Sequence, residues 1–218
     1  MGKFNKPTFY PAYEEKLNVL SHGFGFVLSI IGFILLILRA IKLGGTLHMV
    51  SFSIFGASMI LLYAASTFYH SARSERRRYL LNIVDHACIY ILIAGTYTPF
   101  ALVSLNGWIG WTLFSLVWIL AITGIIFKLF FIGRFQTFST IMYVVMGWII
   151  IAVIKPLLST LSIPGVVLLF AGGILYTIGA ILFSMDKIKF NHAIFHMFVL
   201  AGTFCHFIVI YYYVLPDQ

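Results

Sequence analysis

The stretch LNVLSHGFGFVLSIIGFILLILRAI, residues 17–41, decides the fold class. Only one of its side chains, Arg39, is charged. An α-helix rises about 1.5 Å per residue, so about 20 residues cross the hydrocarbon core of a bilayer. The stretch is too long for the core of a signal peptide, and no small-x-small cleavage site follows it. We therefore expect it to stay in the protein as a first transmembrane helix.

Composition extends this conclusion to the whole chain. The 218 residues are 61% hydrophobic and 9% charged, whereas soluble domains average about 45–50% apolar and about 25% charged residues. A soluble globular enzyme and a disordered chain are both excluded. Further apolar blocks predict one all-α membrane domain over residues 1–218, a bundle of seven transmembrane helices. The expected spans are roughly 17–41, 47–70, 83–104, 108–131, 137–158, 163–185 and 191–214.

The breaks between the spans are short and typical of turns, so consecutive helices should be neighbours in a compact bundle. The expected breaks are Gly44-Gly45, an arginine loop at 71–78, Leu105-Asn106-Gly107, Gly133-Arg134, residues 162–165 and Asp186-Lys187.

The basic residues predict the orientation of the bundle. Of the 14 Lys and Arg residues, 11 fall on the side of the N-terminus and 3 on the other side. Positive charge collects in the short cytoplasmic loops of membrane proteins, which predicts a cytoplasmic N-terminus and an outside C-terminus in the cell membrane. The same bias explains the net charge of +8. We therefore expect no nucleic-acid partner.

Polar side chains from three of the expected helices gather at one depth, near the predicted cytoplasmic side. His70 closes the second span, Asp85 opens the third, and His192 and His196 open the seventh. Ser66 lies four residues before His70 and so shares its helix face. Two histidines four residues apart are a common half-site for a metal ion. Three imidazoles from two helices can therefore converge.

Three protein ligands with an open fourth position are typical of catalytic zinc. Zinc lowers the pKa of the water that it binds to about 7 and so supplies a nucleophile at neutral pH. Asp85 is the candidate general base, and Ser66 is placed to hold the water or to stabilise an oxyanion. From the residues alone, His86 competes with Asp85 for this role, and imidazole also suits iron, copper and nickel. Separate interhelical hydrogen bonds of the histidines are the alternative to a metal site.

A further polar set, Glu15, Asn18 and His22, is spaced i, i+3, i+7 on one face of the first span. These side chains are candidates for hydrogen bonds to metal-binding histidines. The alternative for the acid is the preference of helix N-termini for negative charge, and for His22 a packing role. His206 lies about 15 Å deeper than His196 by helical rise, so we expect it outside the cluster.

Four stretches together resemble a known family: EEKLNVLSHGFG at 14–25, STFYH at 66–70, DHACIYILIAGTYTPF at 85–100 and NHAIFHMFVLAGTFCH at 191–206. The sequence resembles the hemolysin III proteins, the bacterial arm of the progestin-and-adipoQ-receptor superfamily, which includes the adiponectin receptors and is similar to the alkaline ceramidases. The resemblance implies a zinc ion on His70, His192 and His196, with Asp85, rather than its neighbour, and Ser66 at the bound water. It also implies the orientation already derived from charge.

Three functions follow as hypotheses. The first is a zinc-dependent hydrolase, similar to the ceramidase-like amidases, that cuts amide or ester bonds of membrane lipids and serves membrane-lipid homeostasis. The second is a membrane-lytic pore, as the haemolytic name of the family implies. The third is a membrane sensor or receptor whose zinc is structural, with its fourth position filled. Membrane lipids are the expected substrate or ligand, and nothing in the sequence indicates an oligomer.

Overall fold

The computed structural model describes residues 8–131, 135–185 and 187–214, all of whose long elements are helices. Seven helical stretches are long and apolar enough to cross a membrane, so the chain is a multi-pass membrane protein. The prediction of seven apolar helices is confirmed. Gly133, Arg134 and Asp186 of the predicted turns lie outside the described residues. The elements are α1 (Ala12–Leu43), α2 (Thr46–Ser71), α3 (Glu75–Pro99) with η1 (Phe100–Leu105), α4 (Gly107–Phe131), α5 (Gln136–Trp148) with η2 (Ile149–Val153) and α6 (Ile154–Thr160), α7 (Ile163–Phe183) and α8 (Asn191–Tyr213).

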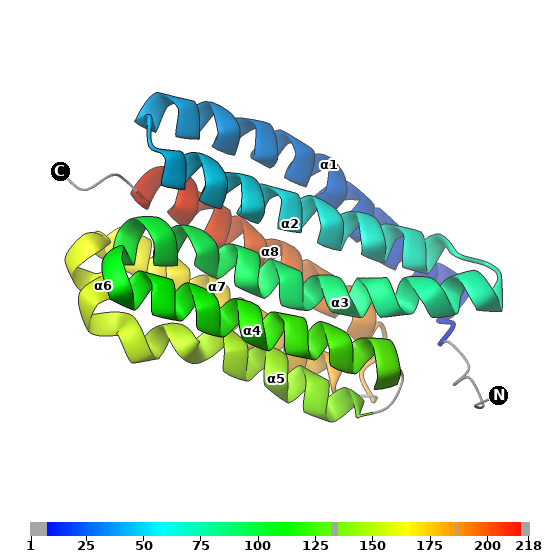
Figure 1. Cartoon of the computed structure of the whole chain (residues 1–218). Coiled ribbons are helices and arrows are strands. Elements are labelled where there is room, and N and C mark those ends of the chain that lie inside the picture. Colours follow the sequence, from blue (N-terminus) through cyan, green and yellow to red (C-terminus); the bar gives the residue numbers. More distant parts are fainter. Residues whose placement is uncertain (1–7, 132–134, 186, 215–218) are drawn as a thin grey trace.

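The helices lie side by side along one common direction (Figure 1). Contacts join α1 to α2, α2 to α3, α3 to α4, and α7 to α8, as short connections require. The helix α1 also contacts α8, so the first and last spans are neighbours. At one end of the bundle α1, α3 and α8 begin and α2 ends. We call it the histidine end, because His70 and His192 lie there.

The start of α3 differs from the prediction. The helix begins at Glu75 instead of residue 83, and the expected arginine loop shrinks to the residues around Ser74. Ser74 caps the helix by accepting the Arg77 N–H at 3.4 Å, and Glu75 places an acid in the first turn. As a result Arg78 lies inside the helix, with a side chain that is only 1% exposed.

Two spans change their helical geometry in the half of the bundle away from the histidine end. Past Pro99, which lacks an N–H donor, α3 continues as the π-helix η1. The Tyr97 hydroxyl lies where α5 passes into the 3-10 helix η2. It accepts the Ile150 N–H at 2.9 Å and lies 2.8 Å from the Gly147 carbonyl oxygen. One buried phenol therefore replaces the backbone partners that the break removes.

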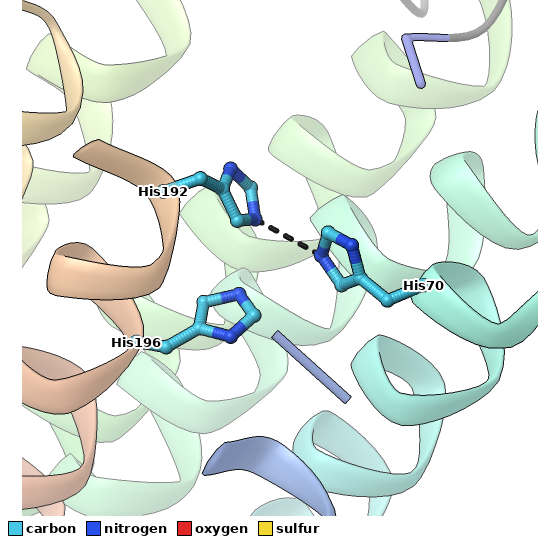
Figure 2. Close-up of side chains that lie close together, drawn as sticks. All are labelled: His70, His192 and His196. Carbon is cyan, nitrogen blue, oxygen red and sulfur yellow. Dashed lines mark hydrogen bonds between the residues drawn. The ribbon is translucent and has the colours of Figure 1, made fainter. Parts of the chain in front are cut away.

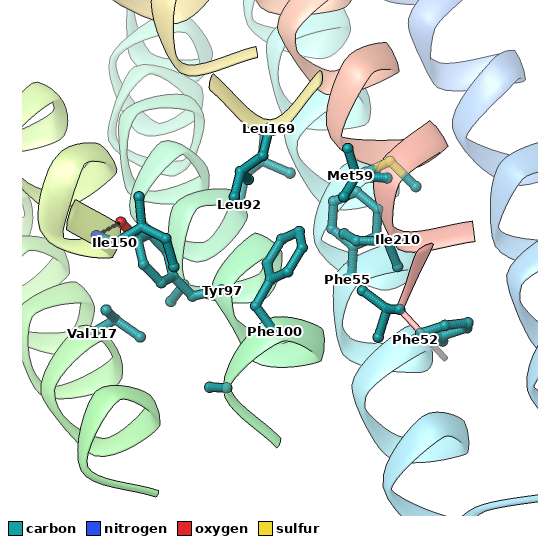
Figure 3. Close-up of a cluster of buried hydrophobic side chains, with 14 of the residues drawn as sticks. Phe52, Phe55, Met59, Leu92, Tyr97, Phe100, Val117, Ile150, Leu169 and Ile210 are labelled. Carbon is teal, nitrogen blue, oxygen red and sulfur yellow. Dashed lines mark hydrogen bonds between the residues drawn. The ribbon is translucent and has the colours of Figure 1, made fainter. Parts of the chain in front are cut away.

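The apolar core fills the same half. Figure 3 shows Phe52, Phe55 and Met59 of α2 facing Phe100 and Ile210, all of them buried. Large apolar side chains at this depth pack the helices together.

A close approach of two helices fixes α7 against α8. A Cβ atom on Gly172 would lie 2.4 Å from His206 Nε2 and 3.1 Å from the Gly202 carbonyl oxygen. Only a glycine fits there without displacement, which agrees with the close helix contact that its sequence position favours.

Candidate metal centre

Three histidines converge at the histidine end. His70 lies in the last turn of α2, and His192 and His196 lie one turn apart at the start of α8. All three are buried, and each offers one nitrogen such that the three atoms lie within 4.8 Å of one another. The Nε2 atoms of His70 and His192 are 3.0 Å apart (Figure 2). The geometry thus meets the first requirement of a metal site, a converging set of donor atoms.

The outward nitrogen of His70 is held by α1. His70 Nδ1 lies 2.8 Å from Glu15 Oε2, and the Asn18 side-chain amide is 3.3 Å from the same nitrogen. A carboxylate only accepts, so His70 Nδ1 carries the proton and donates it to Glu15. The neutral ring then presents an unprotonated Nε2 toward the cluster.

The outward nitrogen of His192 is held by a residue that the sequence did not indicate. Tyr10 lies in the segment before α1, and its hydroxyl is 2.8 Å from His192 Nδ1. Burial, together with neighbouring tyrosine and glutamate side chains, raises the pKa of Tyr10 above its ordinary value. The phenol therefore stays neutral, and its oxygen can accept a hydrogen bond from the imidazole N–H.

His196 follows the same pattern. Its Nδ1 lies 3.2 Å from the Ser21 hydroxyl, and that hydroxyl donates to the Asn18 carbonyl oxygen at 3.1 Å. Because the Ser21 hydrogen is used by the carbonyl, its oxygen accepts from His196 Nδ1. Within the described ranges no hydrogen bond is made to His196 Nε2, which leaves that nitrogen free to ligate.

The donor set therefore fits a metal ion. Ligating histidines almost always donate their other N–H to a carboxylate, backbone carbonyl or water. Here the three outward nitrogens have a carboxylate, a phenol and a hydroxyl as partners. The Nε2 atoms of His70 and His192, 3.0 Å apart, share either a proton or a cation. Distances of about 2.0–2.1 Å from zinc to imidazole nitrogen suit such a separation. The cluster of His70, His192 and His196 can hold a metal ion, and the neutral-nitrogen chemistry suits zinc among others.

Arg78, which the sequence predicted in the arginine loop at 71–78, lies instead beside the histidine cluster. Its guanidinium pairs with Glu15 Oε1 and donates to the Thr8 carbonyl oxygen at 2.7 Å. It lies between two rings, 4.4 Å from the centroid of Phe9 and 4.6 Å from that of Tyr69. Arg78 thus ties the segment before α1 to the acid that orients His70.

A signal for Arg78 was present in the sequence. Arg78, Asn82 and Asp85 are spaced i, i+4, i+7 and share one face of α3, and all three are buried. Tyr10 offered no such signal because it precedes the helix, and Ser21 lies beside the i, i+3, i+7 face rather than on it.

The remaining candidates line a cavity next to the cluster. The cavity has a volume of about 150 Å³, and its walls include His22, Ser66, Asp85, His192 and His196. Within the described part of the chain, the Ser66 hydroxyl and both ring nitrogens of His22 are buried without a hydrogen-bond partner. Buried polar atoms of this kind normally bond to water or to a ligand, so this end of the cavity is built for a polar occupant.

His22 makes no hydrogen bond to the three histidines, contrary to its predicted role. Its ring stacks on His196, with centroids 3.5 Å apart and an angle of 6° between the planes. His86 donates Nδ1–H to the Asn82 carbonyl oxygen at 2.9 Å, which turns its ring away from the cluster. His206 contacts the Leu169 carbonyl oxygen at 3.1 Å and lies outside the three-histidine group, as its depth predicts.

Comparison with known families agrees with this site. Residues 10–207 match the family described as Haemolysin-III related. The chain belongs to the haemolysin-III family. This family member is 51% identical over 203 residues to Hemolysin-3 of Bacillus cereus, with 93% of each chain covered. It is 49% identical over 200 residues to the Hemolysin-3 homolog of Bacillus subtilis (strain 168), covering 92% of this chain and 94% of that one.

More distant similarity links the haemolysin-III protein to a human protein. The chain is 26% identical over 214 residues to the Monocyte to macrophage differentiation factor of Homo sapiens, covering 95% of this chain and 86% of that protein. The family match over residues 10–207 includes His70, His192 and His196. The resemblance drawn from the sequence is confirmed.

Proposed function

We propose that the protein is a zinc-dependent hydrolase that cleaves an amide or ester bond of a membrane lipid. The observation that carries this proposal is the three-histidine cluster at the wall of a cavity that also holds Asp85 and a buried, unpartnered Ser66 hydroxyl. When bound by His70, His192 and His196, zinc supplies Lewis acidity, which polarises a carbonyl group and acidifies water.

The side chains around the cluster have distinct roles in such a reaction. Asp85 takes the proton of the attacking water, because it is the only carboxylate among the described residues that line the cavity. The Ser66 hydroxyl donates a hydrogen bond to the water or to the developing oxyanion. Glu15, Tyr10 and Ser21 keep the three imidazoles oriented.

The shape of the cavity supports a lipid substrate. Its wall follows α3 from Asp85 to Tyr97, about 18 Å at the helical rise. Most of the wall between these residues is apolar, including Ile89, Leu92 and Ile93. An acyl chain can lie along the helices with its carbonyl at the histidines, which suits a substrate that enters from the bilayer.

The first test is the metal content of the detergent-purified protein, measured by elemental mass spectrometry. We expect about one zinc per chain in the wild type and almost none in the His192→Ala/His196→Ala double variant. His48→Ala is the matched control, since His48 is a buried histidine at the opposite end of α2 from His70. Hydrolysis of lipid amides and esters is then compared among the three proteins. A folded wild type without metal would refute the proposal.

We also propose that the histidine end faces the cytoplasm of the bacterial cell. The 11-to-3 bias of basic residues supports this orientation, and the basic residues of α3 lie at that end. A reporter that is active only outside the cytoplasm should be inactive at the N-terminus and active at the C-terminus. The reverse pattern would overturn the orientation.

Membrane lysis is a second candidate, favoured by the name of the Bacillus cereus relative, Hemolysin-3. Lysis by a pore does not require the three histidines, whereas catalysis does. Lysis of red cells by the purified protein that persists unchanged in a His70→Ala/His192→Ala/His196→Ala variant would favour the pore. Lysis that disappears together with zinc would favour damage caused by lipid hydrolysis.

A further inference from the structure

A buried cation lies beside the metal site and has no described role. Lys128, in the last turn of α4, is only 1% exposed and lines the same cavity as the histidines. Among the described residues no carboxylate lies within 4.0 Å of its ammonium group. A charged side chain inside a membrane protein is costly without a partner and usually faces a functional cavity. Exposure this low also excludes the usual escape of lysine, extension of its head group to water.

The position of Lys128 relative to the cluster is set by two consecutive residues of α3. Both Asp85 and His86 line the cavity, and consecutive helical residues point about 100° apart. The charge of Lys128 acts on His86, the residue that follows Asp85 in this turn. The ammonium group therefore flanks the same helical turn as the proposed reacting centre, on its α4 and α5 side.

The polar side chains that α5 contributes to the same cavity, among them Ser139 and Tyr143, are neutral. The Tyr143 hydroxyl donates to the His86 carbonyl oxygen at 3.1 Å, and the Ser139 hydroxyl donates to Phe135 O at 3.2 Å. Each hydroxyl uses its hydrogen in that bond, so its oxygen can accept from an ammonium group but brings no negative charge. Among the described residues, the positive charge of Lys128 therefore has no counter-ion within 4.0 Å, and an anion that enters the cavity can supply one.

The charges of the whole cavity point the same way. Of the described residues in its wall, Asp85 and Lys128 are the only acidic and basic side chains apart from histidines. A divalent ion on neutral imidazoles adds two positive charges, which leaves an excess of positive charge in a largely apolar wall. An anion on the occupant lowers that electrostatic cost.

We propose that Lys128 is an oxyanion-binding subsite, and that the lipid that occupies the cavity carries a carboxylate or phosphate close to the bond held at the histidines. This inference rests on the proposed function and narrows its substrates from lipids in general to anionic lipids. Neutral amides and esters of the same chain length bind more weakly.

Matched ligand pairs test the inference by binding, without turnover. The ligands are ethers, which a hydrolase of amides and esters does not cleave. 1-O-Alkyl-lysophosphatidic acid is compared with 1-O-alkylglycerol of the same chain, and oleyloxyacetic acid with 2-(oleyloxy)ethanol. Each pair shares its ether bond and its chain and differs in the anion. Affinities are measured by titration calorimetry on the wild type in nanodiscs of phosphatidylcholine. We expect the anionic member to bind at least about tenfold more tightly, as a charge-assisted hydrogen bond implies.

Lys128→Met should abolish this preference and leave the affinity for the neutral members within about twofold. Lys128→Gln is a second neutral variant if the first does not fold, and retention of bound zinc in either shows an intact site. Lys155→Met removes an exposed lysine at the other end of the bundle and should keep the preference. An equal preference in the wild type and in Lys128→Met would refute the inference, as would a wild type with no preference.

Two further measurements distinguish binding of a lipid anion from binding of a free anion, and failure of this inference from failure of the proposed hydrolase. Inorganic phosphate and acetate are added as competitors, and competition as strong as that of the lipids would overturn the assignment to a lipid anion. The His192→Ala/His196→Ala variant should still prefer the anionic member through Lys128, although it holds no zinc. A preference that survives there while the wild type hydrolyses nothing would leave this subsite standing and refute only the hydrolase.

Discussion

The orientation of His70 by Glu15 leads to a quantitative prediction for the Glu15→Gln variant. The Glu15 carboxylate accepts from His70 Nδ1 at 2.8 Å, from the Tyr10 N–H at 2.9 Å, and from the Arg78 guanidinium. A glutamine of equal size offers one acceptor oxygen and one NH₂ group. The NH₂ group must therefore face either the His70 N–H or the Arg78 guanidinium. In both cases two hydrogen-bond donors face each other and no bond forms.

Both orientations of the amide weaken the site. If the NH₂ group faces His70, the imidazole loses the acceptor that keeps Nδ1 protonated and Nε2 directed inward. If it faces Arg78, a guanidinium that is only 1% exposed loses its anionic partner. Loss of such an orienting partner typically costs 10–100-fold in metal affinity, which corresponds to about 1.4–2.7 kcal/mol.

Zinc affinity is measured by competition with a chromophoric chelator on protein in detergent. Glu75→Gln is the control, because it removes the same charge from an exposed position at the same end of the bundle. We expect the control to match the wild type and Glu15→Gln to bind zinc 10–100-fold more weakly. A Glu15→Gln affinity within about twofold of the wild type, in a folded protein, would refute the orienting role of Glu15.

Three other variants test a hydrogen bond of the cluster, the packing of α7 on α8 and the hydrogen bonds where α5 passes into η2. Tyr10→Phe keeps the ring but removes the hydroxyl bonded to His192, so zinc affinity should fall about tenfold in the same titration; an unchanged affinity would show that the bond is incidental. Gly172→Ala should lower the free energy of unfolding in denaturant by about 1–3 kcal/mol through overpacking, whereas Gly147→Ala, whose added Cβ meets nothing within 4 Å, should not. Tyr97→Phe leaves a buried N–H without an acceptor and should cost about 1–3 kcal/mol in the same assay; wild-type stability would argue that water replaces the phenol.

Hydropathy predicted the seven apolar helices, because a segment that crosses lipid must satisfy its backbone hydrogen bonds internally and therefore forms a helix. It also placed His70 and His192 at one depth, since depth follows from residue count along a straight helix. Which helices lie side by side does not follow from count alone. The contact of α1 with α8, which brings Ser21 to His196, is a property of the folded bundle.

Arg78 shows a different limit of sequence reasoning. An orientation based on charge counts assumes that every arginine near a span lies in water. The cluster of arginines around residue 77 agreed with that assumption, so the burial of Arg78 was not predicted. Burial of Arg78 depends on an acid from α1 and on three backbone carbonyls near the end of α2. The spacing of Arg78 with Asn82 and Asp85 marks one face of α3. It does not identify these partners, because they come from other parts of the chain.

The contact between α1 and α8 also has a consequence for biosynthesis. Glu15 and Ser21 leave the ribosome before His192 and His196. A nascent chain therefore carries an incomplete site until the span that holds His192 and His196 enters the bilayer. All three imidazoles are present only after that step, so metal capture would report that this span has been inserted. The ion would then join helices that are made at different times.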